Sequence, residues 1–570
     1  MLYSDELIKK DQTWISKISQ DQLLLNEWLV PNLTKEDKIF FIGTGNSSLA
    51  KECADIVNWI DGITVIHSEF DFAKSLNLKN YNVYLFDKYS NDILTLDKKY
   101  SYILDINLTS YAKNEINFIN MINNYFSLLE NNGKILSTLI GLDYIYEGSN
   151  CNITSIEQLT TSLNKNAKVP FEIKMETNLI FSISKKMKKI TFVIPSRNNL
   201  DFLKIAYKSI RNLKTQHEVL ILDDYSIDGT HEWLSSLNDE NLIHYRNEGP
   251  ERIGIVGMFD KGIEMAKTEI IFAFHADMIA GPNLDLNILK HLKPQTIVCA
   301  TRIEPPLHGP GPEKIIQNWG NEAEEIDFNT IINGISFLEK ENENKTTKGI
   351  FAPWCMYKSD YLKIGGHDEL FAPQSKEDSD LFNRFVLNGY ELIQSWDGLV
   401  YHFTSRGSRF NKYSGGAAGK DSEEWKFTTN KNGRNFIRKW GHFVKHDKFM
   451  YPIIPHKFDI GFNIKNSNEL ALYHLEPWCN TIKVDCEYGN YIESEQKNTL
   501  INLSKKITKE DLKNNIIIDI DISSFDNNKF AVIQNISEVI TNINALGSYQ
   551  VEGLNIAIHS LETYEKDFIK

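Results

Sequence analysis

The chain has 570 residues, of which 42% are hydrophobic and 24% charged, and its formal net charge is −14 at pH 7. This length exceeds what a single core supports and predicts roughly two to four domains. The composition is that of a folded soluble protein, and the acidic balance excludes a nucleic-acid partner, which would require a basic stripe. No apolar run approaches the ~20 residues that span a bilayer.

Two features of the sequence bear on where the protein works. The N-terminal residues Met1–Glu6 lack a basic stretch followed by an apolar core, so no secretory signal is expected. The six cysteines are scattered and form no Cys-x-x-Cys pair, which argues against a structural zinc site. Reduced thiols favour a cytoplasmic protein, with peripheral attachment at the inner membrane left open.

The first segment alternates between apolar runs and helical stretches. After an N-terminal helical stretch, a strand is predicted at 38–42, and it runs into the turn Gly43-Thr44-Gly45 and a following helix. Further strands are predicted at 63–67, 83–86, 102–106 and 134–139. This alternation predicts a doubly wound, Rossmann-like α/β domain over residues 1–186.

The rest of the chain divides into two more segments. The basic run at 185–189 is interpreted as a solvated linker. A second α/β domain is predicted over 187–450, with strands at 190–194, 219–222, 270–274 and 297–301. A small α/β domain is predicted over 451–570, with strands at 516–522 and 554–558 and a helix at 532–543. We find no catalytic constellation in this last segment.

Polar residues follow the strand ends of the middle segment. The run at 219–222 ends in Asp223-Asp224, and the run at 270–274 ends in His275-Ala276-Asp277. In open α/β sheets, ligands bind just beyond the carboxyl ends of such strands. Two acids there are costly unless they hold a base edge, a ribose or a metal. The alternative, a cap on the helix around 231–237, explains Asp228 or Ser226 but not this pair.

The series of motifs resembles family-2 glycosyltransferases of the GT-A fold, over residues 190 to about 445. The pattern Asp-Asp-x-Ser-x-Asp-Gly-Thr begins at Asp223, and Glu-Asp-x-Asp-Leu…Arg runs from Glu377 to Arg384. Lys439-Trp440-Gly441 is similar to the family's closing helix region. The resemblance implies a GT-A nucleotide-diphospho-sugar transferase domain that uses a nucleotide-sugar donor, with UDP favoured, and a glycan, lipid-linked or other hydroxyl acceptor.

The resemblance also implies a metal site and a catalytic base. Asp277 and His402 match ligands of Mn²⁺ or Mg²⁺, which neutralises the charge of the departing diphosphate. His275 replaces the first acid of the family's short motif, so the ribose contact becomes imidazole-mediated. Asp378 matches the general base of an inverting transfer. In isolation, His402 would be interpreted as a packed core histidine, and the matched motif series favours the ligand instead. The alternative for Asp378 is a helix N-terminal acid that answers the dipole.

Other positions match the substrate-binding residues of the family. The residues matched to the sugar nucleotide are Pro195, Arg197, Asp223, Asp224, Arg252, His275 and Asp277. The residues placed where relatives hold the acceptor are Trp354, Asp368, Glu369 and Glu377. Trp354 either stacks on a sugar face or packs in the core. Arg406 and Arg409, with the glycine-rich run at 414–419, form either a mobile lid or a surface loop.

The turn of the first segment resembles the nucleotide-binding turn of class I S-adenosylmethionine-dependent methyltransferases. Gly43 and Gly45 would let the backbone approach the cofactor, and Glu69 would hold its ribose hydroxyls. Asp105 ends a later strand near the expected substrate position. The acid that this family carries two residues before the first glycine is Phe41 here. The domain is thus either a working methyltransferase or a retained, inactive scaffold.

The leading hypothesis from the sequence is a metal-dependent, inverting glycosyltransferase fused to a methyltransferase-like domain. Two alternatives stay open. One is a sugar-nucleotide-binding or scaffold protein without turnover, and the other is a glycan methyltransferase whose glycosyl half positions the substrate. The donor sugar, the linkage and the oligomeric state are not specified by the sequence.

Overall fold

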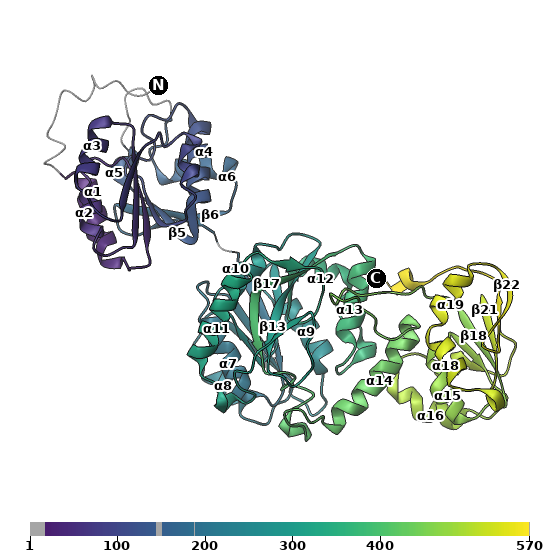
Figure 1. Ribbon diagram of the computed structural model, residues 1–570. Coiled ribbons are helices and arrows are strands. Elements are labelled where there is room, and N and C mark those ends of the chain that lie inside the picture. Colours follow the sequence, from purple (N-terminus) through teal and green to yellow (C-terminus); the bar gives the residue numbers. More distant parts are fainter. Residues whose placement is uncertain (1–17, 144–150, 187, 569–570) are drawn as a thin grey trace. The chain divides into compact units, whose positions relative to one another are not determined.

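The computed structural model describes residues 18–143, 151–186 and 188–568 (Figure 1). The chain forms two compact units, Met1–Met187 and Lys188–Lys570, which are described separately below. The prediction that Met1–Glu6 contains no secretory signal falls outside the described residues, as does Met187 of the basic run. The expected boundary at residue 450 lies inside the second unit and stays a prediction.

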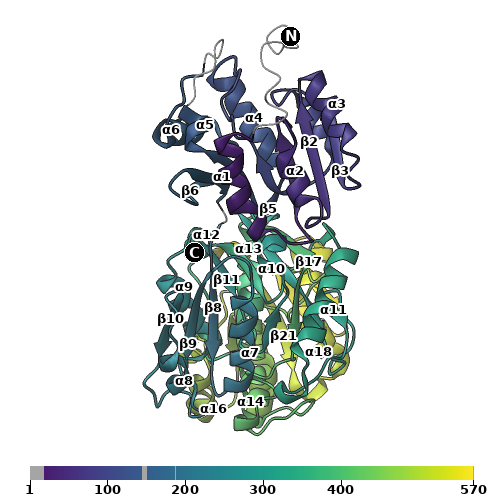
Figure 2. The same cartoon turned by 90° about the vertical axis from the view of Figure 1, so that its left-hand side faces the viewer.

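The first unit is a sheet covered by helices on both faces (Figure 2). The strand order is β3-β2-β1-β4-β5-β7-β6, in which β1 to β5 are parallel and β7 is antiparallel to both neighbours. The strands are β1 (Lys38–Ile42), β2 (Trp59–Thr64), β3 (Tyr81–Leu85), β4 (Tyr100–Leu104), β5 (Leu129–Thr138), β6 (Phe171–Met175) and β7 (Ile180–Lys185). The helices are α1 (Gln20–Leu29), α2 (Ser48–Cys53), α3 (His67–Ser75), α4 (Glu115–Leu128), α5 (Leu139–Asp143) and α6 (Ile156–Asn166).

The apolar run of β1 is explained by burial on both faces of the sheet. Successive side chains of a strand point to opposite faces. Phe40 and Ile42 pack in the cluster that includes α4, whereas Ile39 and Phe41 pack in the cluster that includes α1 and α2. The predicted doubly wound, Rossmann-like α/β architecture of this unit is confirmed.

The expected bounds of the second strand were wrong. β2 ends at Thr64, three residues earlier than predicted, and His67 already begins α3. The hydroxyl of Thr64 accepts a hydrogen bond from the backbone N–H of Ile66 at 3.1 Å, which turns the chain out of the sheet. Glu69 consequently lies in the first turn of α3.

The larger sheet of the second unit has the order β10-β9-β8-β11-β16-β13-β17-β12, with β14 paired to β13 and β15 to β17. The strands are β8 (Ile190–Ser196), β9 (Glu218–Asp223), β10 (Leu242–Arg246), β11 (Ile270–Ala273), β12 (Met278–Ala280), β13 (Thr296–Glu304), β14 (Lys314–Ile316), β15 (Thr346–Thr347), β16 (Trp354–Tyr357) and β17 (Glu391–His402). The helices are α7 (Leu200–Arg211), α8 (Thr230–Ser236), α9 (Gly254–Met265), α10 (Leu284–Leu289), α11 (Phe328–Glu341), α12 (Lys358–Ile364), α13 (Glu377–Leu387) and α14 (Glu423–Trp440).

The parallel strands of this sheet determine where polar residues gather. β10, β9, β8 and β11 run in the same direction, and each is covered by helices on both faces. Helices α7, α8 and α10 cover one face, and α9, α12 and α13 cover the other. The residues that follow β8, β9 and β11 therefore meet at one edge of the sheet.

The smaller sheet of the second unit lies in the C-terminal part of the chain, with the order β20-β19-β18-β21-β23-β22. Its strands are β18 (Ile460–Lys465), β19 (Thr481–Lys483), β20 (Ile507–Thr508), β21 (Ile516–Asp521), β22 (Gly547–Val551) and β23 (Leu554–Ile558). Its helices are α15 (Glu469–Leu475), α16 (Gly489–Glu495), α17 (Leu503–Lys506), α18 (Asn527–Gln534) and α19 (Ile536–Ile543). The single helix expected at 532–543 is two helices that meet at Asn535.

A buried ionic network joins α14 to this C-terminal part. Arg438 donates to Glu476 at 2.6 Å and to Glu495 at 2.6 Å, and Arg434 donates to Glu495 at 3.0 Å. Arg438 and Glu476 are fully buried, so loss of either partner would leave an uncompensated charge in the interior.

Among the described helices, none combines the length and apolarity needed to cross a membrane.

Candidate active site

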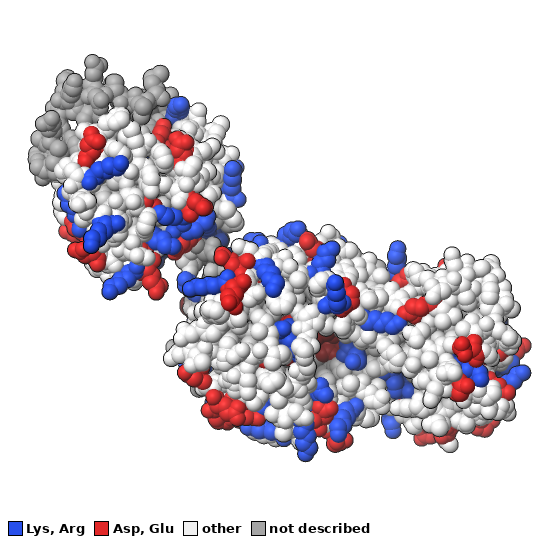
Figure 3. Space-filling view, in the orientation of Figure 1, with Lys and Arg blue, Asp and Glu red and all other residues white. Residues whose placement is uncertain are grey.

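A cavity of about 420 Å³ opens at the carboxyl edge of β8, β9 and β11. The structure brings many of the sequence-predicted residues together in its lining. Those that line it are Pro195, Arg197, Asp224, Arg252, His275, Asp277, Glu377, Asp378 and His402. Figure 3 shows that the surface of the second unit is hollowed near its middle, with Lys and Arg side chains around the hollow.

Three side chains in this cavity are arranged as a possible metal site. Ligand atoms of His275, Asp277 and His402 all lie within 4.8 Å of one another. The sheet register fixes the arrangement, because Met278 of β12 pairs with His402 of β17 and the backbone N–H of Phe403 donates to the carbonyl of Asp277 at 3.0 Å. His402 Nε2 lies 3.6 Å from Asp277 Oδ1. The sequence placed Asp277 and His402 on a metal, and the geometry adds His275 as a third candidate ligand.

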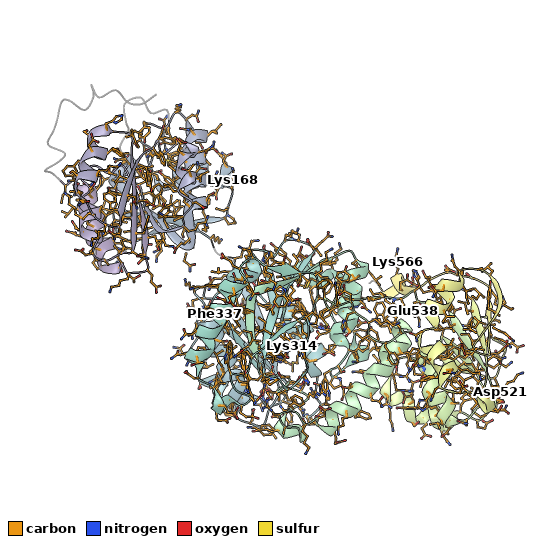
Figure 4. All side chains as sticks on the ribbon, in the orientation of Figure 1. Lys168, Lys314, Phe337, Asp521, Glu538 and Lys566 are labelled. Carbon is orange, nitrogen blue, oxygen red and sulfur yellow. The ribbon has the colours of Figure 1, made fainter. Side chains whose placement is uncertain are left out.

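Glu304 orients the imidazole of His402. It lies at the end of β13, and its Oε1 atom is 2.8 Å from Nδ1 of His402. Lys314, labelled in Figure 4, donates to the other carboxylate oxygen at 2.9 Å. Burial opposes protonation of His402, but the Asp277 and Glu304 carboxylates outweigh burial and raise its pKa to about 9. With Nδ1 held by Glu304, Nε2 is the atom that a cation would bind.

The other two candidate ligands have opposite electrostatic environments. Burial lowers the pKa of His275, so its imidazole is neutral and its lone pair is free to bind a cation. Burial would raise the pKa of Asp277, but His402 and His275 hold it well below its usual value. The backbone N–H of Arg406 also donates to Asp277 Oδ2 at 2.6 Å. The set is thus two imidazoles and one firmly ionised carboxylate.

The adjacent acids Asp223 and Asp224 have different surroundings. Asp224 lines the cavity, and its carboxylate accepts from the backbone N–H groups of Ile253 at 3.0 Å and Gly254 at 2.8 Å. Gly254 has φ +83°, and a Cβ there would lie 2.5 Å from Pro373. Asp223 is fully buried outside the lining, accepts from the N–H of Ser226 at 3.0 Å, and has a pKa raised by burial. Only Asp224 is therefore positioned to contact a ligand directly.

The first turn of α13 contains three acids, Glu377, Asp378 and Asp380. Asp378 faces the cavity beside Glu377, whose side chain is also in the lining. Burial, reinforced by the charge of Asp378, raises the pKa of Glu377 to about 8. Glu377 therefore keeps its proton at neutral pH. Asp380 points elsewhere, since it is buried and accepts from Arg384 Nε at 3.0 Å and Trp440 Nε1 at 2.9 Å.

Two protein families match the part of the chain that forms this site. Residues 191–365 match the family described as glycosyl transferase family 2. The central domain is a family-2 glycosyltransferase domain. Residues 348–408 also match the family described as chondroitin N-acetylgalactosaminyltransferase. No curated protein sequence matches this chain.

Solved structures are similar to separate parts of the chain. GalNAc-T7 with UDP, GalNAc and Mn²⁺ is 13% identical, over 45% of this chain and 49% of its own, with a TM-score of 0.32. A mannosyltransferase from Pyrobaculum calidifontis with GDP-Man and Mn²⁺ is 17% identical, over 41% and 60%, with a TM-score of 0.28. A putative methyltransferase from Streptococcus mutans in complex with SAH is 12% identical, over 30% and 100%, with a TM-score of 0.23. The chain thus spans about half to three fifths of these two glycosyltransferase structures.

Three of the residues expected to hold the acceptor do not line the cavity of the glycosyltransferase domain. Trp354 is 1% exposed and stacks on Tyr361 at 5.9 Å between ring centroids, so it packs in the core. Asp368 accepts from Lys439 at 2.7 Å and caps a short helical turn through the N–H of Leu370. Glu369 is exposed at that turn.

The sequence interpretation missed the wall opposite the strand ends. Trp425 of α14 lines the cavity, and so does the segment 444–452, through Lys445 and His446 among others. This segment is held by the backbone N–H of Ile350, which donates to Met450. No motif marks these residues, since they lie at the end of the glycosyltransferase resemblance or beyond it.

Three arginines near the cavity, Arg197, Arg252 and Arg406, have acidic partners. Arg252 lies 3.6 Å from Asp224 Oδ2, donates to Gln374 at 3.0 Å and forms an ion pair with Glu424. Arg197 lies 3.9 Å from the same Glu424. The guanidinium of Arg406 binds Asn321 and Glu322 instead of entering the cavity.

The loop that contains Arg406 touches the site mainly through its backbone. Ser405, Gly407 and Ser408 line the cavity, whereas residues 414–419 do not. The hypothesis that this loop closes as a lid therefore stays a prediction.

The glycine turn of the first unit is held by the residue that was expected to bind ribose. Gly43 (φ +73°) and Gly45 (φ +46°) have left-handed backbones, and a Cβ on Gly43 would meet nothing within 4 Å. The carboxyl of Glu69 accepts from the Thr64 hydroxyl at 2.7 Å and from the backbone N–H of Gly45, and burial raises its pKa. Asp105 is held by Lys88 at 3.0 Å and Tyr125 at 2.9 Å. Both acids therefore already have protein partners.

Proposed function

We propose that the protein is a metal-dependent, inverting glycosyltransferase that uses a nucleotide-diphosphate sugar, with UDP favoured, and a hydroxyl acceptor on a glycan or lipid-linked sugar. One observation supports this most directly. The triad His275, Asp277 and His402 shares a single cavity with Asp378, at the strand edge where Asp224 also lies. A cation site, a base and a nucleoside contact are the parts that such a transfer requires.

The residues present fit a divalent cation. Two imidazoles and a carboxylate suit Mn²⁺ better than Mg²⁺, which prefers oxygen ligands. Glu304 supplies the carboxylate that orients a metal-bound histidine in many proteins. When bound, the ion would act as a Lewis acid toward the diphosphate.

The residues around Asp378 support its role as the base. In the proposed step, the acceptor oxygen bonds to the anomeric carbon while the bond from that carbon to the diphosphate oxygen breaks. The electron pair leaves with the nucleoside diphosphate, and the acceptor proton passes to Asp378. Attack from the face opposite the leaving group inverts the anomeric centre. Glu377 beside it holds its own proton up to a pH of about 8, so it is not available to take the acceptor proton at neutral pH.

Nucleoside binding is assigned to the other end of the cavity. Asp224 directly follows β9, and Pro195 lies at the end of β8. Arg197 lines the same cavity. Arg252 is bound by Asp224 and Glu424, so a donor diphosphate would have to compete with Glu424 for its guanidinium. We therefore expect Glu424 to move when the donor binds.

A panel of sugar nucleotides tests the proposal. Calorimetry with UDP- and GDP-sugars, with and without Mn²⁺, identifies the donor, and an assay for released nucleoside diphosphate establishes turnover. Metal-dependent binding with slow release of nucleoside diphosphate supports the transferase. Binding without release from any sugar nucleotide would favour a non-catalytic binding protein, an idea motivated by His275 at a position where the family has an acid.

A second activity is favoured by the first unit. The glycine turn with Glu69 beside it is the observation in favour of S-adenosylmethionine binding. Calorimetry of the full chain with S-adenosylmethionine tests this idea, with Gly45→Val as the control. Absence of binding heat in the wild type would leave the unit as a scaffold.

A further inference from the structure

A second, larger cavity adjoins the active site. It measures about 830 Å³ and lies between α14 and the C-terminal helices α15 and α18. Clefts between packed helices are common locations for ligands. The proposed transfer at Asp378 does not involve the residues on the α15 and α18 side of this groove.

The groove shares part of its wall with the active-site cavity. Trp425 lines both. At two further places, consecutive residues line one cavity each: Lys376 precedes Glu377, and Phe443 precedes Val444. Lys376 also lies two residues from Asp378, so a chain whose end reaches Asp378 could continue directly into the groove.

Aromatic side chains form the wall of the groove. Trp478 packs edge-on against Phe443 at 4.9 Å and Phe530 at 6.3 Å between ring centroids. Tyr473 lies on the same groove with the guanidinium of Arg434 3.9 Å from its ring centre. Phe443 is 46% exposed, so part of its ring is open to the groove. Aromatic faces of this kind pack well against the apolar C–H faces of sugar rings.

The polar residues of the groove are mainly basic. Lys376, Arg409, Lys426 and Arg434 line it, with Asp421 as the acid among them. Three of these cations have acidic partners, since Arg409 pairs with Asp421, Lys426 with Glu423 and Arg434 with Glu495. No described residue forms a hydrogen bond or ion pair with the ammonium of Lys376 at the junction of the two cavities. The buried hydroxyl of Thr429 also has no hydrogen-bond partner among the described residues.

From the shared wall, the aromatic lining and the ammonium of Lys376, we propose that the groove binds the acceptor as an oligosaccharide that carries anionic groups. The acceptor hydroxyl would lie at Asp378, the acidic group nearest to it would pair with Lys376, and the preceding sugars would pack on Tyr473 and Phe530. This proposal rests on the proposed glycosyltransferase function. It makes the C-terminal part of the chain an acceptor-binding module.

The proposal is tested by binding of hexasaccharides to the full chain. The probes are a uronate-containing hexasaccharide, a sulfated hexasaccharide and neutral maltohexaose, measured by calorimetry at low salt. We expect at least one anionic probe to bind at least tenfold more tightly than maltohexaose. The two anionic probes distinguish carboxylate from sulfate recognition.

Two variants in the groove and two matched controls locate the binding. Tyr473→Ala and Lys426→Glu should each weaken binding of the anionic probe at least fivefold. Phe427→Ala, at an aromatic that is 63% exposed on α14, and Lys497→Glu should leave it unchanged, because neither residue lines the groove. Equal binding of anionic and neutral probes by the wild type, or wild-type binding by both groove variants, would overturn the proposal.

Release of nucleoside diphosphate in the absence of an acceptor separates this inference from the proposed function. It should occur at the same rate in the wild type, Tyr473→Ala and Lys426→Glu, since these residues lie away from the donor. No release by the wild type with any sugar nucleotide would refute the proposed function. Normal release together with unchanged hexasaccharide binding in the groove variants would refute the groove alone.

Discussion

His402 and Glu304 are joined by a hydrogen bond of 2.8 Å between Nδ1 and Oε1. Glu304 is itself held by Lys314 at 2.9 Å and lies 3.2 Å from Arg302. A carboxylate on one ring nitrogen fixes the ring and directs the other nitrogen toward a cation. The candidate metal site therefore depends on a residue that is not itself a ligand.

Glu304→Gln tests this dependence. Removing the charge while keeping the shape should weaken Mn²⁺ binding about tenfold, because the imidazole becomes less basic and less firmly oriented. The measurement is calorimetric titration of Mn²⁺. Glu313→Gln is the matched control, since Glu313 lies 3.3 Å from Arg302 and 3.4 Å from Lys314 and has no hydrogen bond or ion pair with His402 among the described residues. If both variants bind Mn²⁺ as the wild type does, Glu304 does not support a metal ligand.

Asp378→Asn separates catalysis from binding. The amide cannot accept the acceptor proton, so the transfer rate should fall by ~10²–10⁴-fold. Donor affinity should stay within about threefold, because the donor is held by other residues of the cavity. Steady-state kinetics and donor titration check the two expectations. Turnover near the wild-type rate would show that another group is the base.

Asp380→Asn should act on stability instead of chemistry. Asp380 is fully buried and holds both Arg384 and Lys439, with Lys439 Nζ at 2.6 Å. Removing this charge leaves the buried Arg384 without its acid, while Lys439 keeps Asp368 at 2.7 Å, and the loss costs on the order of 3–5 kcal/mol. Denaturant unfolding should show this loss, and the same experiment on Asp378→Asn should show almost none. Equal unfolding free energies for the two variants would contradict the assignment of the two acids.

Glu377→Gln should change how stability depends on pH. The native carboxyl has a pKa of about 8, against 4.5 for the ordinary group, because burial and then Asp378 disfavour its charge. Between these values the unfolded state is ionised while the native state still holds its proton. Raising the pH therefore destabilises the wild type relative to the Gln variant, by up to a few kcal/mol.

Melting temperatures at pH 4, 6 and 9 measure this effect. The two proteins should differ least at pH 4, where both states of the wild type are protonated. The Gln variant should gain progressively through pH 6, and the advantage should level off above pH 8. A difference that is constant across these pH values would mean that Glu377 titrates normally in the folded protein.

The strands of the fold were the most predictable elements. β1 and β23 have the expected bounds, since each is an apolar run closed by turn residues. The expected bounds of β2 were displaced because the apolar run continues past the strand, whereas the hydrogen bond that the Thr64 hydroxyl accepts from the Ile66 N–H turns the chain out of the sheet. The break at Asn535 was missed for a similar reason, because the apolar pattern of α18 and α19 is nearly continuous.

The site was predictable only where it is local in the sequence. The strand ends that carry Asp224, His275 and Asp277 follow from their apolar runs, and the structure gathers them in one cavity. Glu304 gave no signal, because it is 98 residues from His402 and meets it only through the pairing of β13 with β17. Trp354 shows the converse, since its aromatic character fits a sugar platform equally well as the core in which it lies.

Release of nucleoside diphosphate from a sugar nucleotide is the most direct test of the central claim. The wild type should release it in the presence of Mn²⁺, stop on addition of a chelator, and lose the activity on substitution Asp277→Asn. Release that is unaffected by both the chelator and Asp277→Asn, or no release from any UDP- or GDP-sugar, would contradict a metal-dependent glycosyltransferase.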